Sequence, residues 1–325
     1  MRLIIDTDTA GDDCFSMLLG MLQGKATVEA VTICNGNIPF PQQAENALKT
    51  IEIAGLAGQV PVYEGCTLPL LRRPVDAAYV DHGADGMSDA NYPKTAQRPE
   101  PGHAVDAMID IVMRHPGEIT IVAQAPLTNI AMAVRKEPGF AKAVKHLWIM
   151  GGTDNAMGNV TPAAEFNFYV DPEAAAIVLN AGFEASLVTW TLTLVDSEIT
   201  EKELAEIEAL DTPLSRFFHQ VNSAAVAFSL ARYGNGATVH PDALTCALAL
   251  DENLIVESEM CRVDIETEGR LTRGYSSVSS SRLPDQDVAD PELGAALPAN
   301  IRVIRKADRH GFRDMLVAVL GKERH

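Results

Sequence analysis

The sequence has little that would suit it to nucleic acids, membranes or an oxidising environment. Its 26 Lys and Arg residues stand against 44 Asp and Glu residues, giving a formal net charge of −18. Nucleic acids and anionic membranes both require basic patches, so this charge argues against either partner. No run of 18 apolar residues is present, and the N-terminus lacks the charged and apolar regions of a secretory signal peptide. The five cysteines are scattered without Cys-x-x-Cys spacing, which favours a reduced, cytoplasmic protein with no zinc site.

The chain does have the length and apolar content needed for a sizeable core. It contains 325 residues, of which 47% are apolar. Short apolar runs alternate with helical stretches, which predicts crossover units and a mostly parallel central sheet flanked by helices. The predicted strands cover residues 3–5, 28–34, 60–63, 119–123, 147–150, 187–194, 260–266 and 301–305. Residues 200–231 are expected to be helical and 276–290 to form a loop. No linker is evident, so we expect a single α/β domain over residues 1–325 with a Rossmann-type core.

An acidic stretch follows the first predicted strand. Asp6, Asp8, Asp12 and Asp13 fall within eight residues, just before a mostly apolar helical stretch. A helix N-terminus stabilises each negative charge by only about 0.3–1 kcal/mol. Close like charges raise each other's pKa unless a cation neutralises them. A hard divalent cation bound by oxygen ligands is the simplest physical reason for this cluster.

Three common patterns share features with the acidic stretch. Two of the four acids could be ordinary helix caps. An EF-hand loop is excluded, because its fifth position would be Ala10 and its twelfth Met17 instead of Glu. A strand ending in Asp-x-Asp is also typical of aspartyl-phosphate phosphatases, in which Asp6 would be the nucleophile. Those enzymes usually carry Thr or Val where Ala10 stands, and this interpretation leaves Asp12 and Asp13 unexplained.

Polar residues also follow several other predicted strands. Asn37, Gln124 and the pair at 151–152 each come just after a strand, as Asp6 and Asp8 do. Ligands bind at the carboxyl edge of open α/β sheets, so these residues are expected to share one cleft. The irregular stretch 68–101 is long enough to be functional, and residues 81–86 within it are expected to form a mobile lid.

The octad at residues 6–13 resembles the Asp-x-Asp-x-x-x-Asp-Asp signature of nucleoside hydrolases of the inosine–uridine-preferring type. Further segments look like landmarks of that family in the family's order: 36–37, 126–129, 150–152, 158–159, 164–167, 171–175 and 272–274. The resemblance therefore covers most of the chain. It implies a nucleoside hydrolase-like fold, with the active site at the C-terminal ends of the strands.

The resemblance implies a reaction and a set of roles. The expected activity is Ca²⁺-dependent hydrolysis of the N-glycosidic bond of ribonucleosides, performed by a homodimer or homotetramer. Ca²⁺ would be held by Asp8, Asp13, Asp242 and the backbone carbonyl of Gln124, with Asp8 as general base on the attacking water. Asp12 would bind the ribose 2′-hydroxyl, and Asp6 would lie outside direct contact. The remaining substrate contacts would come from Asn37, Met150, Asn159, Glu165 and Asn167.

The leaving-group side departs from the family pattern. Some relatives place a His immediately before the metal-binding Asp, whereas here Pro241 precedes Asp242 and His240 lies one residue further back. We therefore consider His240 and His82 as catalytic candidates and favour His82. The base could instead be activated by stacking on an aromatic ring, for which Trp190, Phe228 and Tyr233 are candidates.

The sequence does not decide between purine and pyrimidine substrates. A non-catalytic nucleoside- or ribose-binding protein on the same scaffold stays open as an alternative.

Overall fold

A nine-stranded, mostly parallel sheet forms the centre of the molecule. The computed structural model describes residues 1–75, 79–280 and 298–323. The strand order is β10-β9-β11-β6-β5-β4-β1-β2-β3. From β11 to β3 neighbouring strands are parallel, while β9 and β10 add an antiparallel edge. The strands are β1 (Arg2–Thr7), β2 (Thr27–Ile33), β3 (Val62–Glu64), β4 (Ile119–Ala123), β5 (His146–Met150), β6 (Ala185–Val188), β9 (Ile255–Ile265), β10 (Ser276–Ser280) and β11 (Ile301–Ala307). The predicted fold class is therefore confirmed.

Strand β1 lies where the order of the strands reverses. It pairs with β2 on one side and β4 on the other, so the chain builds the sheet outward in both directions from this strand. Leu3 and Ile5 belong to the core on one face and Ile4 to the core on the other. A strand buried on both faces reads as a continuous apolar run, which is what residues 3–5 show. Because ligands bind beyond the carboxyl ends of strands at such a reversal, the acidic stretch after β1 is well placed for a site.

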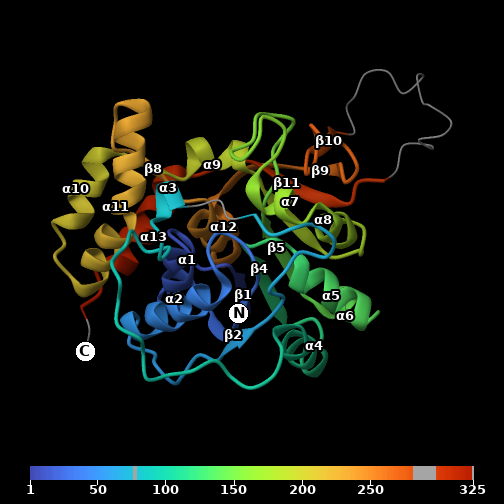
Figure 1. The fold of residues 1–325 in the computed structure, drawn as a ribbon, viewed down its shortest axis with the longest axis horizontal. Coiled ribbons are helices and arrows are strands. Elements are labelled where there is room, and N and C mark those ends of the chain that lie inside the picture. Colours follow the sequence, from blue (N-terminus) through green and yellow to red (C-terminus); the bar gives the residue numbers. More distant parts are fainter. Residues whose placement is uncertain (76–78, 281–297, 324–325) are drawn as a thin grey trace.

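Helices cover both faces of the sheet (Figure 1). Helices α4, α5, α6 and α8 pack on one face, and α1, α2, α11, α12 and α13 contribute to the core on the other. The helices are α1 (Asp13–Leu22), α2 (Phe40–Ile53), α3 (Tyr79–His82), α4 (Ala104–Arg114), α5 (Thr128–Lys136), α6 (Phe140–Ala143), α7 (Phe166–Val170), α8 (Pro172–Leu179), α9 (Trp190–Asp196), α10 (Glu201–Glu208), α11 (Pro213–Tyr233), α12 (Pro241–Leu250) and α13 (Arg309–Leu320), and a short 3₁₀ turn covers Glu252–Leu254. A separate two-stranded sheet joins β7 (Glu198–Ile199) to β8 (Thr238–Val239).

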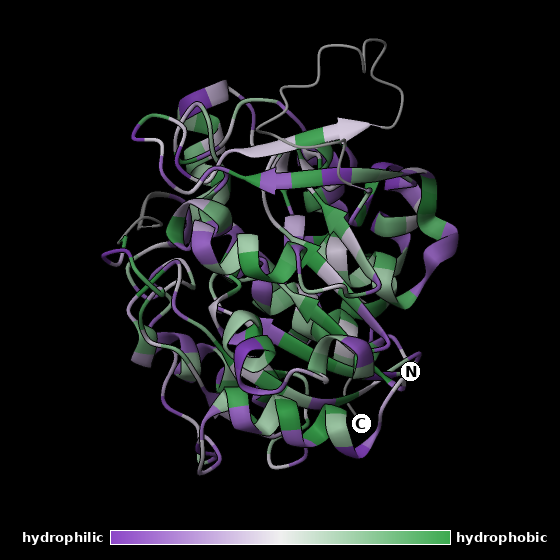
Figure 2. Ribbon diagram, turned by 90° about the vertical axis from the view of Figure 1, so that its right-hand side faces the viewer, coloured by the Kyte–Doolittle hydropathy of each residue, from purple (hydrophilic) through white to green (hydrophobic). Residues whose placement is uncertain are grey.

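Figure 2 shows hydrophobic residues concentrated on the central strands, with hydrophilic ones on outer helices and loops. No helix in the described parts of the chain has both the length and the apolar character to cross a membrane.

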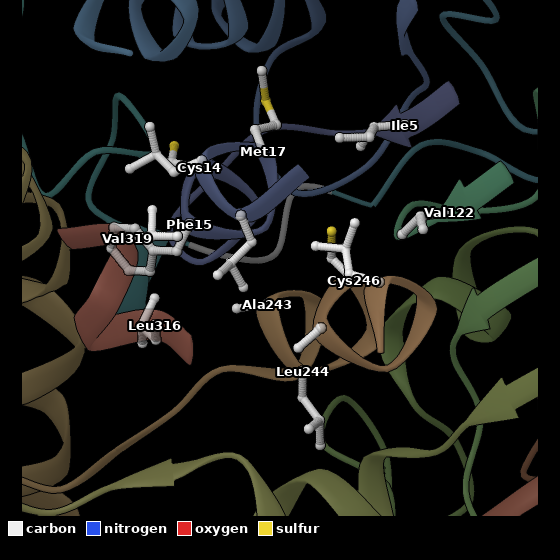
Figure 3. Packing of buried hydrophobic residues seen from close by; sticks show 14 of the residues in the cluster. Ile5, Cys14, Phe15, Met17, Val122, Ala243, Leu244, Cys246, Leu316 and Val319 are labelled. Atoms are coloured by element: carbon white, nitrogen blue, oxygen red, sulfur yellow. The ribbon is translucent and has the colours of Figure 1, made fainter. Parts of the chain in front are cut away.

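Helices α1 and α12 pack against each other, although they are far apart in sequence (Figure 3). Phe15 and Cys14 of α1 share one hydrophobic cluster with Ala243 and Cys246 of α12, all at 0% exposure. Burying a large apolar side chain contributes roughly 1.5–3 kcal/mol, so this contact is a substantial constraint on how the two helices lie. It brings the N-terminus of α12, and with it Asp242, to the N-terminus of α1.

Three sequence predictions about elements are wrong in part. The predicted strand 187–194 ends at Val188, because Thr189 caps a new helix by accepting a hydrogen bond from the Leu192 N–H at 3.4 Å. The helical stretch 200–231 is two helices, because Asp211 takes a φ of 48° and Thr212 and Pro213 begin a second helix. Residues 276–280 form strand β10 on β9 instead of a loop, and 281–290 lie outside the described residues.

Candidate active site

The acidic octad forms the end of β1 and the N-terminus of α1. Asp12 is the residue before the helix and Asp13 its first residue, where the helix dipole favours negative charge. The Asp13 carboxylate accepts hydrogen bonds from the Thr7 hydroxyl (2.5 Å), the Gln124 side-chain amide (2.9 Å) and the Ala10 N–H (3.0 Å). These contacts fix Asp13 in a fully buried position between β1 and the end of β4.

Asp8 sits against the end of β2. Its Oδ2 accepts a hydrogen bond from the Asn37 N–H at 2.6 Å, while its Oδ1 is buried and has no hydrogen-bond partner among the described residues. A Cβ atom at Gly36 would lie 1.8 Å from Asp8 Oδ2, so only glycine allows the β2 turn to approach this closely. One oxygen of Asp8 is thus held by the protein, and the other, like Asp6 Oδ2, is buried without a partner among the described residues.

Asp242 reaches the octad from the other end of the sequence. Its N–H donates a hydrogen bond to Asp12 Oδ2 at 2.8 Å, so the first turn of α12 is capped by the carboxylate of the residue before α1. Burial raises the pKa of Asp242, and the negative charges of Asp12, Asp13 and Asp8 raise it further. The structure therefore brings together Asp8, Asp12, Asp13 and Asp242 despite some 230 residues of separation.

Glu165 and Asn167 extend the site from the β5 side. The Glu165 carboxylate accepts hydrogen bonds from the N–H groups of Gly152 (2.7 Å) and Asn167 (2.8 Å). The Asn167 side chain donates to the carbonyl of Met150 at 3.2 Å. The charge of Glu165 adds to the raised pKa of both Asp8 and Asp242, which shows that it belongs to the same acidic group.

Two further sugar-contact candidates lie at the edges. Asn159 is exposed, and its Oδ1 accepts the Phe166 N–H at 2.9 Å, which ties the preceding loop to α7. Asn37 offers a half-buried side chain beside Asp8.

Within the described residues, the acids of this site are buried without a Lys or Arg to compensate them. Burial raises the pKa of Asp6, Asp12 and Glu165 to about 7, with Asp13 adding to the effect on Asp12. Burial, followed by repulsion from Asp13, also raises the pKa of Asp8. Among the described ion pairs, none joins these carboxylates to a Lys or Arg. Removing several carboxylates from water is costly, and either protonation or a bound cation relieves this cost.

The residues fit a hard cation in charge and donor type. All the candidate ligands are oxygen atoms, which Ca²⁺ and Mg²⁺ prefer. Asp8 Oδ1 is buried and accepts no hydrogen bond from the described residues. Within the described ranges, no three His, Cys, Asp or Glu side chains are already arranged as a metal-ligand group. Both oxygens of Asp13 accept protein hydrogen bonds instead. The candidate ligands thus match a hard cation in atom type and charge. To bind such an ion, Asp13 would have to give up one of its hydrogen bonds to the protein.

The two candidate histidines lie in different surroundings. His82 ends α3 and its half-buried ring lies on the octad: a Cβ at Gly11 would be 2.3 Å from its Nδ1. The charge of His82 acts to lower the pKa of Asp12 and Asp13, against the larger effect of burial.

His240 instead lies in the core. Its ring packs on Phe15 and Phe218 at centroid distances of 5.5 and 5.4 Å, and its Nε2 is 2.9 Å from the Thr238 hydroxyl. Burial lowers the pKa of His240 to about 3, so the ring is neutral at neutral pH and carries no spare proton for a leaving group.

The aromatic candidates are spread over two helices. Trp190 begins α9 and has a half-buried side chain; its backbone N–H donates to the carbonyl of Gly152 at 2.9 Å, and the N–H of Gly152 in turn binds Glu165. Phe228 and Tyr233 lie on the last two turns of α11 and pack edge to face on each other at 6.2 Å, with Tyr233 67% exposed. Trp190 is thus tied to the site by its backbone, whereas the other two rings pair with each other.

Sequence reasoning missed several polar residues that hold the acids. Asp6 Oδ1 accepts hydrogen bonds from the Thr32 hydroxyl (2.7 Å) and the Asn129 side chain (2.8 Å). Ser16 donates to the side chain of Gln124 at 2.5 Å, and Asn46 reaches the octad backbone. The available signal was a polar residue between apolar neighbours, as Thr32 lies between Val31 and Ile33 and Ser16 between Phe15 and Met17.

Comparisons with known proteins point to one family of enzymes. A family model described as inosine-uridine preferring nucleoside hydrolase matches residues 3–314. The inosine-uridine preferring nucleoside hydrolase of Crithidia fasciculata is 36% identical over 305 residues, covering 91% of this chain and 93% of that protein. The pyrimidine-specific ribonucleoside hydrolase of Photobacterium profundum is 32% identical, covering 97% and 96%. A solved plant nucleoside hydrolase superposes with a TM-score of 0.91 at 31% identity, covering 98% of each chain.

Proposed function

The chain belongs to the inosine-uridine preferring nucleoside hydrolase family, and from this premise we propose that it cleaves ribonucleosides with the help of Ca²⁺. It is a ribonucleoside hydrolase, an N-glycosidase that releases a free base and ribose. The metal proposal rests on the buried group of Asp8, Asp12, Asp13, Glu165 and Asp242, whose pKa values are all raised. The proposed ligands are the carboxylates of Asp8, Asp13 and Asp242 and the backbone carbonyl of Gln124.

The acidic side chains suit the charge that the reaction develops. Breaking an N-glycosidic bond creates positive oxocarbenium character at the sugar carbon. Carboxylates held beside the sugar by the protein stabilise this charge without reorganising during the reaction. When bound, Ca²⁺ would offset their repulsion in the resting enzyme and lower the pKa of water. We assign Asp8 Oδ1, to which no described protein group donates, as the atom that accepts the proton of the attacking water.

The sugar is held by the same group of residues. Asp12 is proposed to accept a hydrogen bond from the 2′-hydroxyl, and Glu165 and Asn167 to bind other hydroxyls. Glu165 is well suited to a fixed position, because backbone N–H groups from two segments hold its carboxylate. Binding energy from these contacts can be used to distort the ribose towards the transition state. Asn37, Asn159 and Met150 complete the proposed sugar side.

The leaving base faces His82 in this proposal. The His82 ring lies on the octad turn at Gly11, whereas His240 is enclosed by Phe15 and Phe218. We therefore assign proton donation to the departing base to His82 and no proton transfer to His240. Trp190 is the aromatic residue whose backbone is tied to the sugar-binding loop, which makes it the candidate for stacking on the base. The cytoplasmic location and a homodimeric or homotetrameric assembly stay predictions.

The test of this function is a substrate panel with and without chelation. Purified protein is expected to release base from at least one of inosine, uridine, cytidine and adenosine, and to lose this activity in EDTA. Adding back Ca²⁺ should restore turnover. No release from any of the four substrates would contradict the activity, and turnover that survives exhaustive chelation would contradict the metal. Nucleoside binding by calorimetry without hydrolysis would instead select a binding protein.

The raised pKa values predict how stability depends on pH in the absence of metal. Asp6, Asp12 and Glu165 have a pKa of about 7 in the folded protein, against about 4 in an unfolded chain. Between these values the folded state holds more protons than the unfolded state, so stability falls as pH rises from about 4 to 7. Each extra proton held contributes up to about 1.4 kcal/mol per pH unit. In EDTA the melting temperature should therefore drop between pH 5 and pH 8.

Calcium should reverse this loss where the carboxylates are charged. The gain in melting temperature on adding CaCl₂ is expected to be small at pH 5 and large at pH 8, because protons and Ca²⁺ compete for the same oxygens. NaCl at equal ionic strength is the control for screening. A melting temperature in EDTA that is flat or rising from pH 5 to pH 8 would show that the pKa values of these acids are not raised in the folded protein.

A further inference from the structure

The segment 81–92 is built around the carboxylate of Asp85. Ser88, Asp89 and Asn91 have φ values of 57°, 55° and 49°, a left-handed conformation that is uncommon for residues other than glycine. The Asp85 carboxylate accepts hydrogen bonds from the N–H groups of Met87 (2.7 Å), Asp89 (2.9 Å) and Asn91 (2.7 Å). Three bonds to one side chain hold the unusual backbone in place. The segment therefore has a defined shape of its own.

This segment is fastened to the acidic turn by Asn46 of α2. The Asn46 side-chain amide donates to the carbonyl of Thr9, inside the octad, at 3.0 Å. The same nitrogen donates to the carbonyl of Asp85 at 2.8 Å. Its Oδ1 accepts a hydrogen bond from Gln42 at 2.9 Å, which orients the amide so that both N–H groups face these carbonyls. Asn46 is 2% exposed, and its polar atoms are used in this bridge.

Two further contacts dock the segment at either side. The Gly11 N–H of the octad donates to the carbonyl of Gly86 at 2.8 Å. The Ser88 hydroxyl donates to the carbonyl of Val221 at 2.5 Å and accepts the Ala224 N–H at 3.0 Å, both on α11. The segment thus spans from the octad to the long helix α11, near α3 in Figure 1.

The attachments determine where His82 lies. The carbonyl of His82 accepts a hydrogen bond from the Ser88 N–H at 2.7 Å, which ties its backbone to the docked segment. Its ring fills the space over Gly11 where any side chain at that position would collide with it. Asn46 itself belongs to α2 and contacts the site through the two carbonyls it bridges. Its hydrogen bonds are thus suited to setting the distance between the His82 segment and the acids.

We propose that Asn46 is a positioning residue, which latches the segment 81–92 onto the acidic turn and so holds His82 on the leaving-group side of the site. The latch consists of Asn46, Asp85 and Ser88. The inference rests on the proposed function, since it assigns a purpose to the position of His82. It predicts that Asn46 affects catalysis mainly through His82, beside any effect of its hydrogen bond to the Thr9 carbonyl in the acidic turn.

A double-mutant cycle tests this dependence. Asn46→Ala is expected to lower kcat/KM for the best nucleoside substrate about tenfold or more. In a His82→Ala background the same change should cost less than about twofold, because the residue it positions is gone. Equal factors in both backgrounds would overturn the proposal. If Asn46→Ala does not fold, Ser88→Ala is used in its place. It removes the hydrogen bonds between the same segment and α11 without removing a buried amide, and it is tested in the same two backgrounds.

Asn300→Ala is the matched control. The Asn300 amide also bridges two backbone carbonyls, those of Leu179 (3.2 Å) and Val263 (2.9 Å), at the opposite end of the sheet. It should lower the melting temperature to a similar extent and leave kcat/KM unchanged. If Asn300→Ala reduces kcat/KM as much as Asn46→Ala does, the effect is one of general stability and the proposal is wrong.

A readout without turnover separates this inference from the proposed function. The NMR signals of the His82 imidazole, assigned by their loss in His82→Ala, should shift or broaden in Asn46→Ala and stay unchanged in Asn300→Ala. Unchanged His82 signals in Asn46→Ala would overturn the latch even in an active enzyme. Absence of nucleoside hydrolysis by the unmodified protein would contradict the proposed function alone.

Discussion

Asp8→Asn is expected to lower kcat for ribonucleoside hydrolysis by about 10³-fold or more while the protein stays folded. A general base alone contributes typically about 10²–10⁴-fold, and Asp8 is also a proposed ligand of Ca²⁺. Its Oδ1 is buried and accepts no hydrogen bond from the described part of the protein, while its Oδ2 accepts the Asn37 N–H, a contact that the amide oxygen of Asn can keep. Steady-state kinetics with the best nucleoside of the panel measure the loss.

The same substitution should stabilise the protein in EDTA. Burial and repulsion from Asp13 raise the pKa of Asp8, so its charged form is disfavoured in the folded state and its removal relieves that cost. The melting temperature of Asp8→Asn in EDTA is therefore expected to equal or exceed that of the unmodified protein at pH 8. Opposite changes in activity and stability are typical of a residue retained for function.

Asp6→Asn is the matched comparison. Asp6 is equally buried and lies two residues away. Its Oδ1 accepts hydrogen bonds from Thr32 and Asn129, which an amide oxygen can retain, and its Oδ2, like Asp8 Oδ1, has no partner among the described residues. We expect a loss of activity much smaller than that of Asp8→Asn. If Asp8→Asn keeps more than about a tenth of the activity, or if Asp6→Asn is the more damaging change, then the assignment of the base to Asp8 is wrong.

The central part of the fold could be predicted from sequence because local patterns determine it. Residues 3–5 form a strand buried on both faces, and such a strand has no polar alternation to confuse the pattern. The acids after it, Asn37 after β2 and Gln124 after β4 follow from the rule that parallel strands deliver their ends to one edge. Asp242 required the family resemblance, because nothing local indicates that α12 packs on α1.

The errors arise where tertiary contacts decide the structure. The apolar run 187–194 fits a strand and a buried helix equally well, and the cap at Thr189 divides it between β6 and α9. The serines of β10 form a strand because β9 offers them an edge to pair with. The role inferred for Asn46 likewise depends on two carbonyls, one 37 and one 39 residues away, which no sequence pattern on α2 reveals.

His82→Ala is expected to lower kcat for nucleosides by about 10²-fold, because a positioned general acid typically contributes that much or more. The effect should depend on the leaving group. A nucleobase departs more easily when it is protonated, whereas nitrophenolate departs as a stable anion. Hydrolysis of a nitrophenyl riboside by His82→Ala should therefore stay within a few-fold of the unmodified enzyme. Comparing kcat/KM for the two substrates isolates proton donation from sugar binding, which both substrates share.

His240→Ala provides the contrast within the same experiment. The His240 ring is buried against Phe15 and Phe218 and its pKa is lowered to about 3, so its removal leaves a cavity and deprives the reaction of no proton. It should lower the melting temperature and reduce turnover of both substrates by the same factor. The opposite result would show that His240 is the proton donor and His82 is not. In that case His240→Ala would lose activity on nucleosides alone, and His82→Ala would lose activity equally on both substrates. Since the ring of His82 lies on the acidic turn and that of His240 lies in the core, we expect the selective loss only in His82→Ala.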